Sequence, residues 1–175
     1  GDLLPIKIIL RDLAASDHLP LKKRGIVAHL KKFLEAALME WGIQASLPFV
    51  MQQLEDGRAI LLFDGFDEIS DKDRRAQVCQ IINECAARHG ACRILVTSRT
   101  TSQEHLALTG FSTAKLAQFA EGQICWFVDR WYDYITTIKR RDSKTAKRYA
   151  ASLKWAINHD ARLQEFARRP LLLTL

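Results

Sequence analysis

The stretch "AILLFDGFDEIS", from Ala59 to Ser70, decides the fold of this chain. Its apolar half predicts a buried β-strand, because a short continuous apolar run suits a strand of a parallel sheet better than a half-exposed one. Asp64 is the first polar residue after the run, and Asp67 and Glu68 follow it closely. A tight turn at Gly65 is expected to bring the carboxylates together at the carboxyl end of the strand.

Further apolar runs and helical stripes surround this strand. Strands are predicted over residues 3–10, 58–63 and 92–100, whereas the local pattern of residues 111–119 leaves strand and loop open. The segment after the first strand is expected to form a loop. Helices are predicted over residues 22–41, in a shorter segment that ends at Gly57, from a capping box of Ser70 with Asp73 to His89, and in two stripes after residue 120.

Strands that alternate with helices predict an α/β fold, since parallel strands need crossover connections. We expect a parallel sheet covered by helices on both faces over residues 1–120, and a small helical lid subdomain over residues 121–175. Open parallel sheets bind ligands beyond the carboxyl ends of their strands, which is where the acids lie.

The acids suggest a metal site. Neighbouring carboxylates repel one another unless a cation neutralises them, and a hard divalent ion with oxygen ligands does so readily. An apolar strand that ends in Asp is the Walker B pattern, in which Asp holds Mg²⁺ on a nucleoside triphosphate. The alternative is that the acids only cap the following helix.

Arg99 ends the next predicted strand, after Thr97 and Ser98. An arginine at this sheet edge can bind a terminal phosphate, and the alternative is a plain ion pair with one of the acids. The sequence contains no Gly-Lys pair, so a P-loop does not occur within it.

The order of these motifs resembles a NACHT domain, a branch of the STAND class of P-loop NTPases. "AILLFDGFDEI" is similar to the family's Walker B form, "RILVTSR" to its sensor 1 strand, "PIKIILRDLA" to the strand after the P-loop helix, and "RRPLLLTL" to a motif of the helical domain. The likeness covers residues 5–175. It implies a P-loop NTPase-type parallel sheet lacking the P-loop strand, with residues 111–119 as its last strand, followed by the helical lid.

The resemblance also implies a function. Mg²⁺ and ATP (or GTP) are the expected cofactors, with slow hydrolysis that switches self-association in signalling or defence. Asp64 would hold Mg²⁺ through water, Asp67 and Glu68 would order or activate the attacking water, and Arg99 would contact the γ-phosphate. Pro170 would pack on the nucleobase, although a proline in the first turn of a helix is equally natural there.

Parts of the family pattern are missing, namely the P-loop, its strand, and what would follow residue 175. The chain begins without Met and ends inside an apolar run, so we expect a piece of a longer protein. The missing strand should leave a gap in the sheet that a partner segment fills or that stays an exposed edge. Alone, such a piece should bind nucleotide poorly and be inactive, with sensing and effector domains outside it.

Composition narrows the possible locations and partners of the protein. The chain has 175 residues and 48% hydrophobic content, and no apolar run approaches the roughly 20 residues that span a bilayer, so a cytoplasmic protein is expected. Its four cysteines lack metal-site spacing and are expected to be free thiols. The net charge is +6, yet the basic run 139–148 has no interleaved aromatic platform, so nucleic acid is not expected as a partner.

The main alternative function is a non-catalytic protein-interaction module that keeps the fold.

Overall fold

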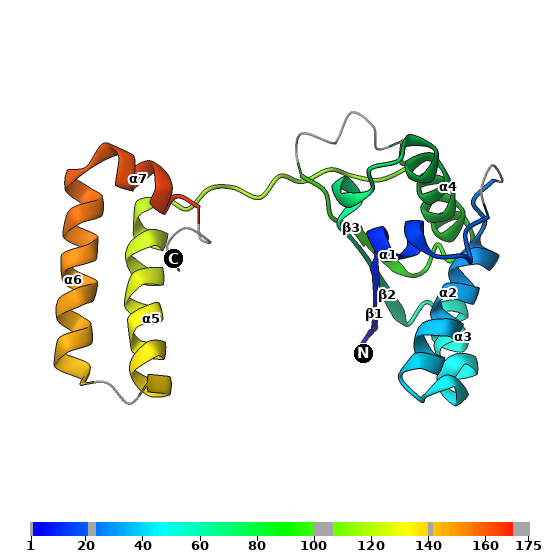
Figure 1. The fold of residues 1–175 in the computed structure, drawn as a ribbon, viewed down its shortest axis with the longest axis horizontal. Helices are drawn as coiled ribbons and strands as arrows, with labels where there is room; N and C mark the ends of the chain where they lie inside the picture. Colours follow the sequence, from blue (N-terminus) through cyan, green and yellow to red (C-terminus); the bar gives the residue numbers. More distant parts are fainter. Residues whose placement is uncertain (1, 21–23, 100–106, 140–141, 170–175) are drawn as a thin grey trace. The chain divides into compact units, whose positions relative to one another are not determined.

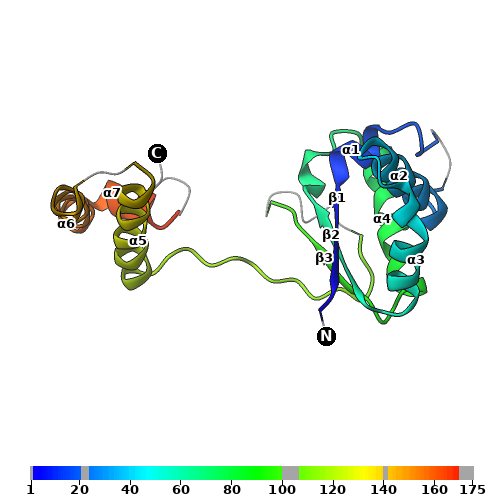
Figure 2. The ribbon, with the colours of Figure 1, turned by 90° about the horizontal axis from the view of Figure 1, so that it is seen from below.

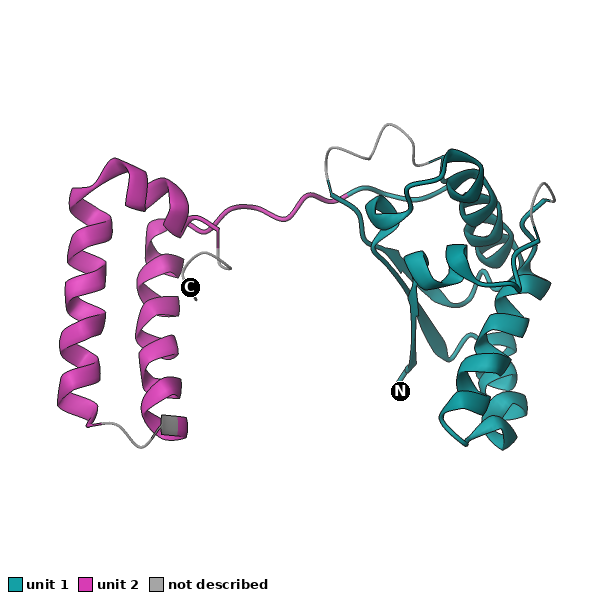
Figure 3. Cartoon of the chain, in the orientation of Figure 1, with its two compact units in different colours: residues 1–113 teal, residues 114–175 magenta. Residues whose placement is uncertain are grey.

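The computed structural model describes residues 2–20, 24–99, 107–139 and 142–169. The chain divides into two compact units, residues 1–113 and 114–175 (Figure 3). The predicted start of the helical part at residue 121 coincides with the first residue of helix α5, while the contacts divide the chain slightly earlier, in the segment before that helix.

The first unit contains a parallel three-stranded sheet (Figure 1). Its strands, in the order β1-β2-β3, are β1 (Leu4–Ile9), β2 (Ala59–Asp64) and β3 (Arg93–Val96). The register pairs Ile9 of β1 with Asp64 of β2, and Phe63 of β2 with Val96 of β3. The predicted strands are therefore confirmed: β1 and β3 are shorter than predicted, and β2 is shifted by one residue to end at Asp64. The carboxyl ends of the strands meet at one edge of the sheet.

The helices of this unit are α1 (Leu10–Ala15), α2 (Val27–Glu40), α3 (Leu47–Glu55) and α4 (Lys72–Arg88), with 3-10 turns η1 (Gln44–Ser46) and η2 (Phe66–Glu68). The loop predicted after the first strand is wrong, because α1 follows β1 directly. Leu10, Leu13 and Ala14 bury one face of this short helix, which packs on α4. The predicted helix over 22–41 is confirmed in its main part and begins at Val27.

The predicted capping box at the start of α4 is wrong by one residue. Asp71, not Ser70, is the N-cap, and its carboxylate accepts a hydrogen bond of 2.8 Å from the backbone N–H of Arg74. A carboxylate at the N-cap also interacts favourably with the helix dipole, which favours Asp71 over the neighbouring serine. The predicted end of this helix at His89 is confirmed as its C-cap.

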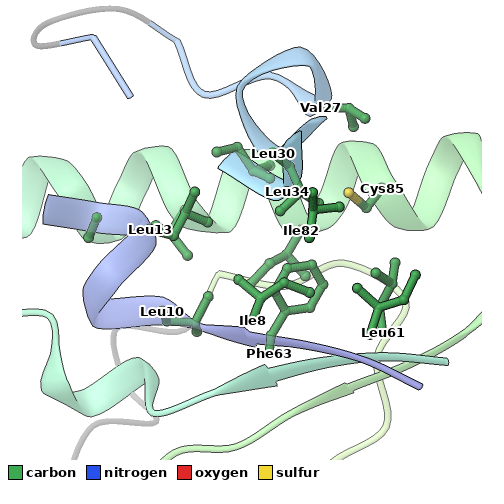
Figure 4. Packing of buried hydrophobic residues seen from close by; sticks show 14 of the residues in the cluster. Ile8, Leu10, Leu13, Val27, Leu30, Leu34, Leu61, Phe63, Ile82 and Cys85 are labelled. Carbon is green, nitrogen blue, oxygen red and sulfur yellow. The ribbon is translucent and has the colours of Figure 1, made fainter. Parts of the chain in front are cut away.

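The helices of the first unit cover one face of the sheet (Figure 2). Every second residue of β1 and β2 is buried, and Ile8, Leu61 and Phe63 meet Leu34 of α2 and Ile82 of α4 in the core (Figure 4). On the opposite face the side chains of this unit are exposed or half-buried, as in the alternate pattern of β3. The prediction that helices cover both faces therefore does not hold for the described residues of this unit.

The predicted strand over 111–119 is not formed in this structure. These residues are extended but pair with no strand, and the side chain of Leu116 is 97% exposed. A strand is stable only when a neighbour satisfies its backbone groups, and the described sheet ends at β3. Just before this segment, Asn83 of α4 holds the chain in place by accepting from Thr109 N–H and donating to the carbonyl of Ala107.

The second unit consists of α5 (Glu121–Lys139), α6 (Ser143–His159) and α7 (Ala161–Ala167). The two apolar stripes predicted for this region are confirmed: α5 and α6 pack along each other, with Ile124, Val128, Ala150 and Ile157 in a small core. Asp142 and Asp160 cap α6 and α7 through their carboxylates. Within the described ranges, no helix is both long and apolar enough to cross a membrane.

The four cysteines are free thiols, as predicted. Cys79 and Cys85 are buried, and Cys92 and Cys125 are partly buried. Burial raises the pKa of the Cys85 thiol to about 12, so this thiol is protonated at neutral pH.

Candidate functional site at the carboxyl edge of the sheet

The carboxyl ends of β2 and β3 are joined by hydrogen bonds around Thr97. Thr97 N–H donates to the carbonyl of Phe63 at 2.9 Å, and its own carbonyl accepts from Phe66 N–H at 3.0 Å. The Thr97 hydroxyl also accepts from the backbone N–H of Gly65 at 2.9 Å. These bonds fix the turn after β2 against the end of β3.

Gly65 makes the turn possible. Its φ of 79° and ψ of 50° lie in the left-handed region, where a residue with a side chain is strained. A Cβ at this position would also approach Cδ of Glu68 at 3.2 Å. The turn continues into η2, where Phe66 is fully buried in the core. The apolar anchor thus fixes the backbone that bears Asp67 and Glu68.

Asp64, the last residue of β2, contacts a hydroxyl and a cation. Thr97 Oγ1 donates to Asp64 Oδ1 at 2.6 Å, and Lys7 Nζ of β1 lies 3.0 Å from Asp64 Oδ2. The hydrogen bond from Thr97 and, next, that from Lys7 hold the pKa of the Asp64 carboxyl below its usual value. Asp64 is therefore an ionised, partly exposed carboxylate at neutral pH.

Asp67 and Arg99 form a pair with two contacts. The backbone N–H of Arg99 donates to Asp67 Oδ1 at 3.0 Å, and Arg99 Nε lies 3.2 Å from Asp67 Oδ2. The Asp67 side chain is only 14% exposed, whereas the Arg99 side chain is 82% exposed. The ion pair considered as the alternative for Arg99 is therefore present, and it leaves most of the arginine side chain open to solvent.

Glu68 has a different cationic partner. Arg11 of α1 places Nη1 3.3 Å from Glu68 Oε2, and its Nε also lies 3.4 Å from Asp12. Both members of the Arg11–Glu68 pair are substantially exposed, so the pair contributes little to stability. The short helix α1, which the sequence pattern did not predict, brings Arg11 to this edge of the sheet.

The structure brings the expected residues to one edge but does not join the acids into one cluster. Asp64, Asp67 and Glu68 each contact a different cation, and no group of three or more His, Cys, Asp or Glu side chains in the described ranges is arranged to hold a metal ion. The predicted nucleobase contact, Pro170, lies outside the described residues.

Comparison with protein-family models, with curated proteins and with solved structures finds no match to this chain.

Lys7 and Arg11 are functional candidates that the sequence reasoning missed. Lys7 is a charged residue in an otherwise mostly apolar strand, which is a signal that was available, but its partner depends on the strand register.

A cavity of about 460 Å³ lies elsewhere, beside α4, and its lining, which includes Lys72, Cys79 and Asn83, contains none of the expected site residues.

Proposed function

We propose that this chain is the central part of a cytoplasmic NTPase of the NACHT type, in which Mg²⁺ with ATP or GTP binds at the carboxyl edge of the sheet and slow hydrolysis switches self-association. The sensing and effector domains would lie outside this chain. The observation that carries the proposal is the position of Asp64 at the end of the central strand, with Thr97 and Arg99 at the end of the next strand.

The donor chemistry at Asp64 is compatible with a hard divalent cation. The carboxylate is ionised, partly exposed and adjacent to the Thr97 hydroxyl, and oxygen donors of this kind suit Mg²⁺, which keeps several of its waters. When bound, Mg²⁺ would neutralise phosphate charge. Asp64 is the residue that would hold it.

Asp67 and Arg99 would then divide the remaining roles. The exposed guanidinium of Arg99, held by its backbone and by Asp67, is suited to bind a terminal phosphate as a planar donor. Asp67 and Glu68, which lie on the same turn, would orient or activate water. The sequence likeness gives these roles, and the geometry is compatible with them.

The test is nucleotide binding and phosphate release by the full-length protein with Mg²⁺. Asp64→Asn is expected to weaken Mg-dependent binding by about tenfold or more, because it removes the carboxylate that holds the hydrated ion. Asp67→Asn and Glu68→Gln are expected to slow phosphate release while binding persists.

Asp56→Asn is the matched control. Like Asp64, Asp56 pairs with a cation, Arg58 at 3.8 Å, but it caps α3 before the opposite end of β2. This variant should bind and hydrolyse nucleotide as the wild type does. Equal behaviour of Asp64→Asn and Asp56→Asn, or no nucleotide binding by the full-length protein, would refute the proposal.

The second candidate is a non-catalytic interaction module. It is favoured by one observation: each of the three acids already has a cationic partner within the chain. In such a module these ion pairs would be purely structural. Background-level phosphate release that is identical in the wild type, Asp67→Asn and Glu68→Gln, together with unchanged partner binding, would support it.

A further inference from the structure

Lys7 is an exposed residue of β1, outside the hydrophobic core, and its side chain reaches Asp64. In the register of the sheet Lys7 pairs with Leu62, so Asp64 is two residues further along the neighbouring strand on the same face. Diagonal neighbours of this kind are within reach of a long side chain. The face is the one that the helices of the first unit leave uncovered (Figure 2).

The two oxygens of Asp64 have different partners. Thr97 donates to Oδ1 at 2.6 Å, and the Lys7 ammonium lies 3.0 Å from Oδ2. The Lys7 and Asp64 side chains are 58% and 44% exposed, so water and ions reach the pair. An ammonium at this distance occupies Oδ2, the carboxylate oxygen that Thr97 does not contact, and places a positive charge beside it.

We propose that Lys7 is a built-in counter-ion of Asp64 that competes with the divalent metal for this carboxylate. The inference rests on the proposed role of Asp64 and adds a regulation of that site. Metal binding requires the ammonium to leave Oδ2, whereas the Thr97 bond to Oδ1 persists. Lys7 therefore lowers the affinity of the site for the metal, and it keeps the Asp64 side chain oriented while no metal is bound.

Competition is specific to Lys7 among the cations at this edge. Arg11 contacts Glu68 and Asp12, and Arg99 contacts Asp67, so neither is paired with Asp64. The compact ammonium on a flexible stem leaves its partner more easily than a planar guanidinium does. An exposed pair also adds little to stability, so a purely structural role accounts poorly for a lysine at this position.

The test measures Mn²⁺ binding to the full-length protein by electron paramagnetic resonance, without nucleotide. Lys7→Met is expected to bind Mn²⁺ about two- to fivefold more tightly than the wild type, the range that loss of an exposed ion pair allows. Lys7→Arg should stay within twofold of the wild type or bind more weakly. In the double variant Lys7→Met with Asp64→Asn, the gain should disappear.

Arg93→Met controls for net charge. Arg93 lies on the same face, pairs with Ile60, and is about 13 Å from Asp64 along the strands, a distance at which salt screens exposed charges. The Arg93→Met variant should bind Mn²⁺ with the affinity of the wild type. A gain equal to that of Lys7→Met would show a general charge effect and overturn the inference.

The remaining outcomes separate the two proposals. Equal or weaker Mn²⁺ binding by Lys7→Met would overturn the role of Lys7 and leave the proposed function standing. If neither the wild type nor Lys7→Met binds Mn²⁺ while both still bind Mg-nucleotide, the role of Lys7 is likewise overturned and the proposed function stands. If the wild type binds neither Mn²⁺ nor Mg-nucleotide, both the inference and the proposed function are contradicted.

Discussion

Thr97 contacts the end of β2 and the turn after it through its hydroxyl, its N–H and its carbonyl. Thr97→Val keeps the shape of the side chain but removes both hydroxyl hydrogen bonds. We expect a loss of about 1 kcal/mol in the free energy of unfolding at pH 7, because one donor and one acceptor lose their partner.

This loss should depend on pH. The pKa of Asp64 is lowered in the folded state, chiefly by Thr97, so its stabilising contribution is complete above the unfolded pKa and declines as pH falls below about 4. The difference between wild type and Thr97→Val in urea unfolding should therefore be smaller at pH 3 than at pH 7. Ser98→Ala, which removes only a bond to the Arg99 carbonyl, should show no such trend.

The residues of the site were only partly predictable. The position of Asp64 at a strand end followed from the apolar run before it, since hydrophobic pattern is a local signal. The partners of the acids did not follow, because the Lys7–Asp64 contact depends on the register of two strands far apart in sequence. Arg11 was missed because a short helix with one turn of apolar residues has almost no periodic signal.

At the scale of elements, two glycines that end helical segments allow a matched test. Gly42 and Gly57 have φ values of 71° and 70°, but a Cβ on Gly42 meets nothing within 4 Å, whereas one on Gly57 meets Cβ of Ala91 at 2.6 Å. Gly42→Ala should cost about 1 kcal/mol of unfolding free energy through backbone strain alone. Gly57→Ala should cost clearly more, because it also pushes the α3–β2 turn away from the end of α4.

Chemical denaturation of the two variants measures this difference. Equal losses would show that the backbone at Gly57 relaxes freely and that the close approach to Ala91 does not constrain the first unit. A larger loss at Gly57 would show that this contact fixes where β2 begins.

Elements were predicted well where they are long and stabilised by their own stripe of apolar residues. The three strands followed from their continuous apolar runs, and α2, α4, α5 and α6 followed from helical periodicity. The local pattern of residues 111–119 left strand and loop open, and the family resemblance favoured the strand. That prediction is wrong because a strand needs a neighbour for its backbone groups, and none is present in the described sheet. Pairing of this kind is a property of the assembled sheet and has no local signature.

For the whole molecule, the exposed residues before α5 predict where proteases act. Lys115 is exposed and lies in extended backbone, whereas Lys154 lies in α6 and pairs with Asp129 at 2.7 Å. Brief trypsin digestion should cut after Lys115 well before Lys154, since cleavage needs an unfolded stretch of chain. Mass spectrometry of the fragments measures the order, and Lys115→Gln should abolish only that cut. Cleavage at Lys154 as early as at Lys115 would contradict the expectation.

The bonds from Thr97 to the β2 end have a consequence for the order of folding. They join residues 32 and 33 positions apart, and the whole of α4 lies between them. Closing such a loop costs entropy, so we expect these contacts to form once the intervening helix has docked and shortened the loop. The turn at Gly65 should therefore assemble later than α4, and the carboxyl edge of the sheet should reach its final arrangement only after that helix has docked.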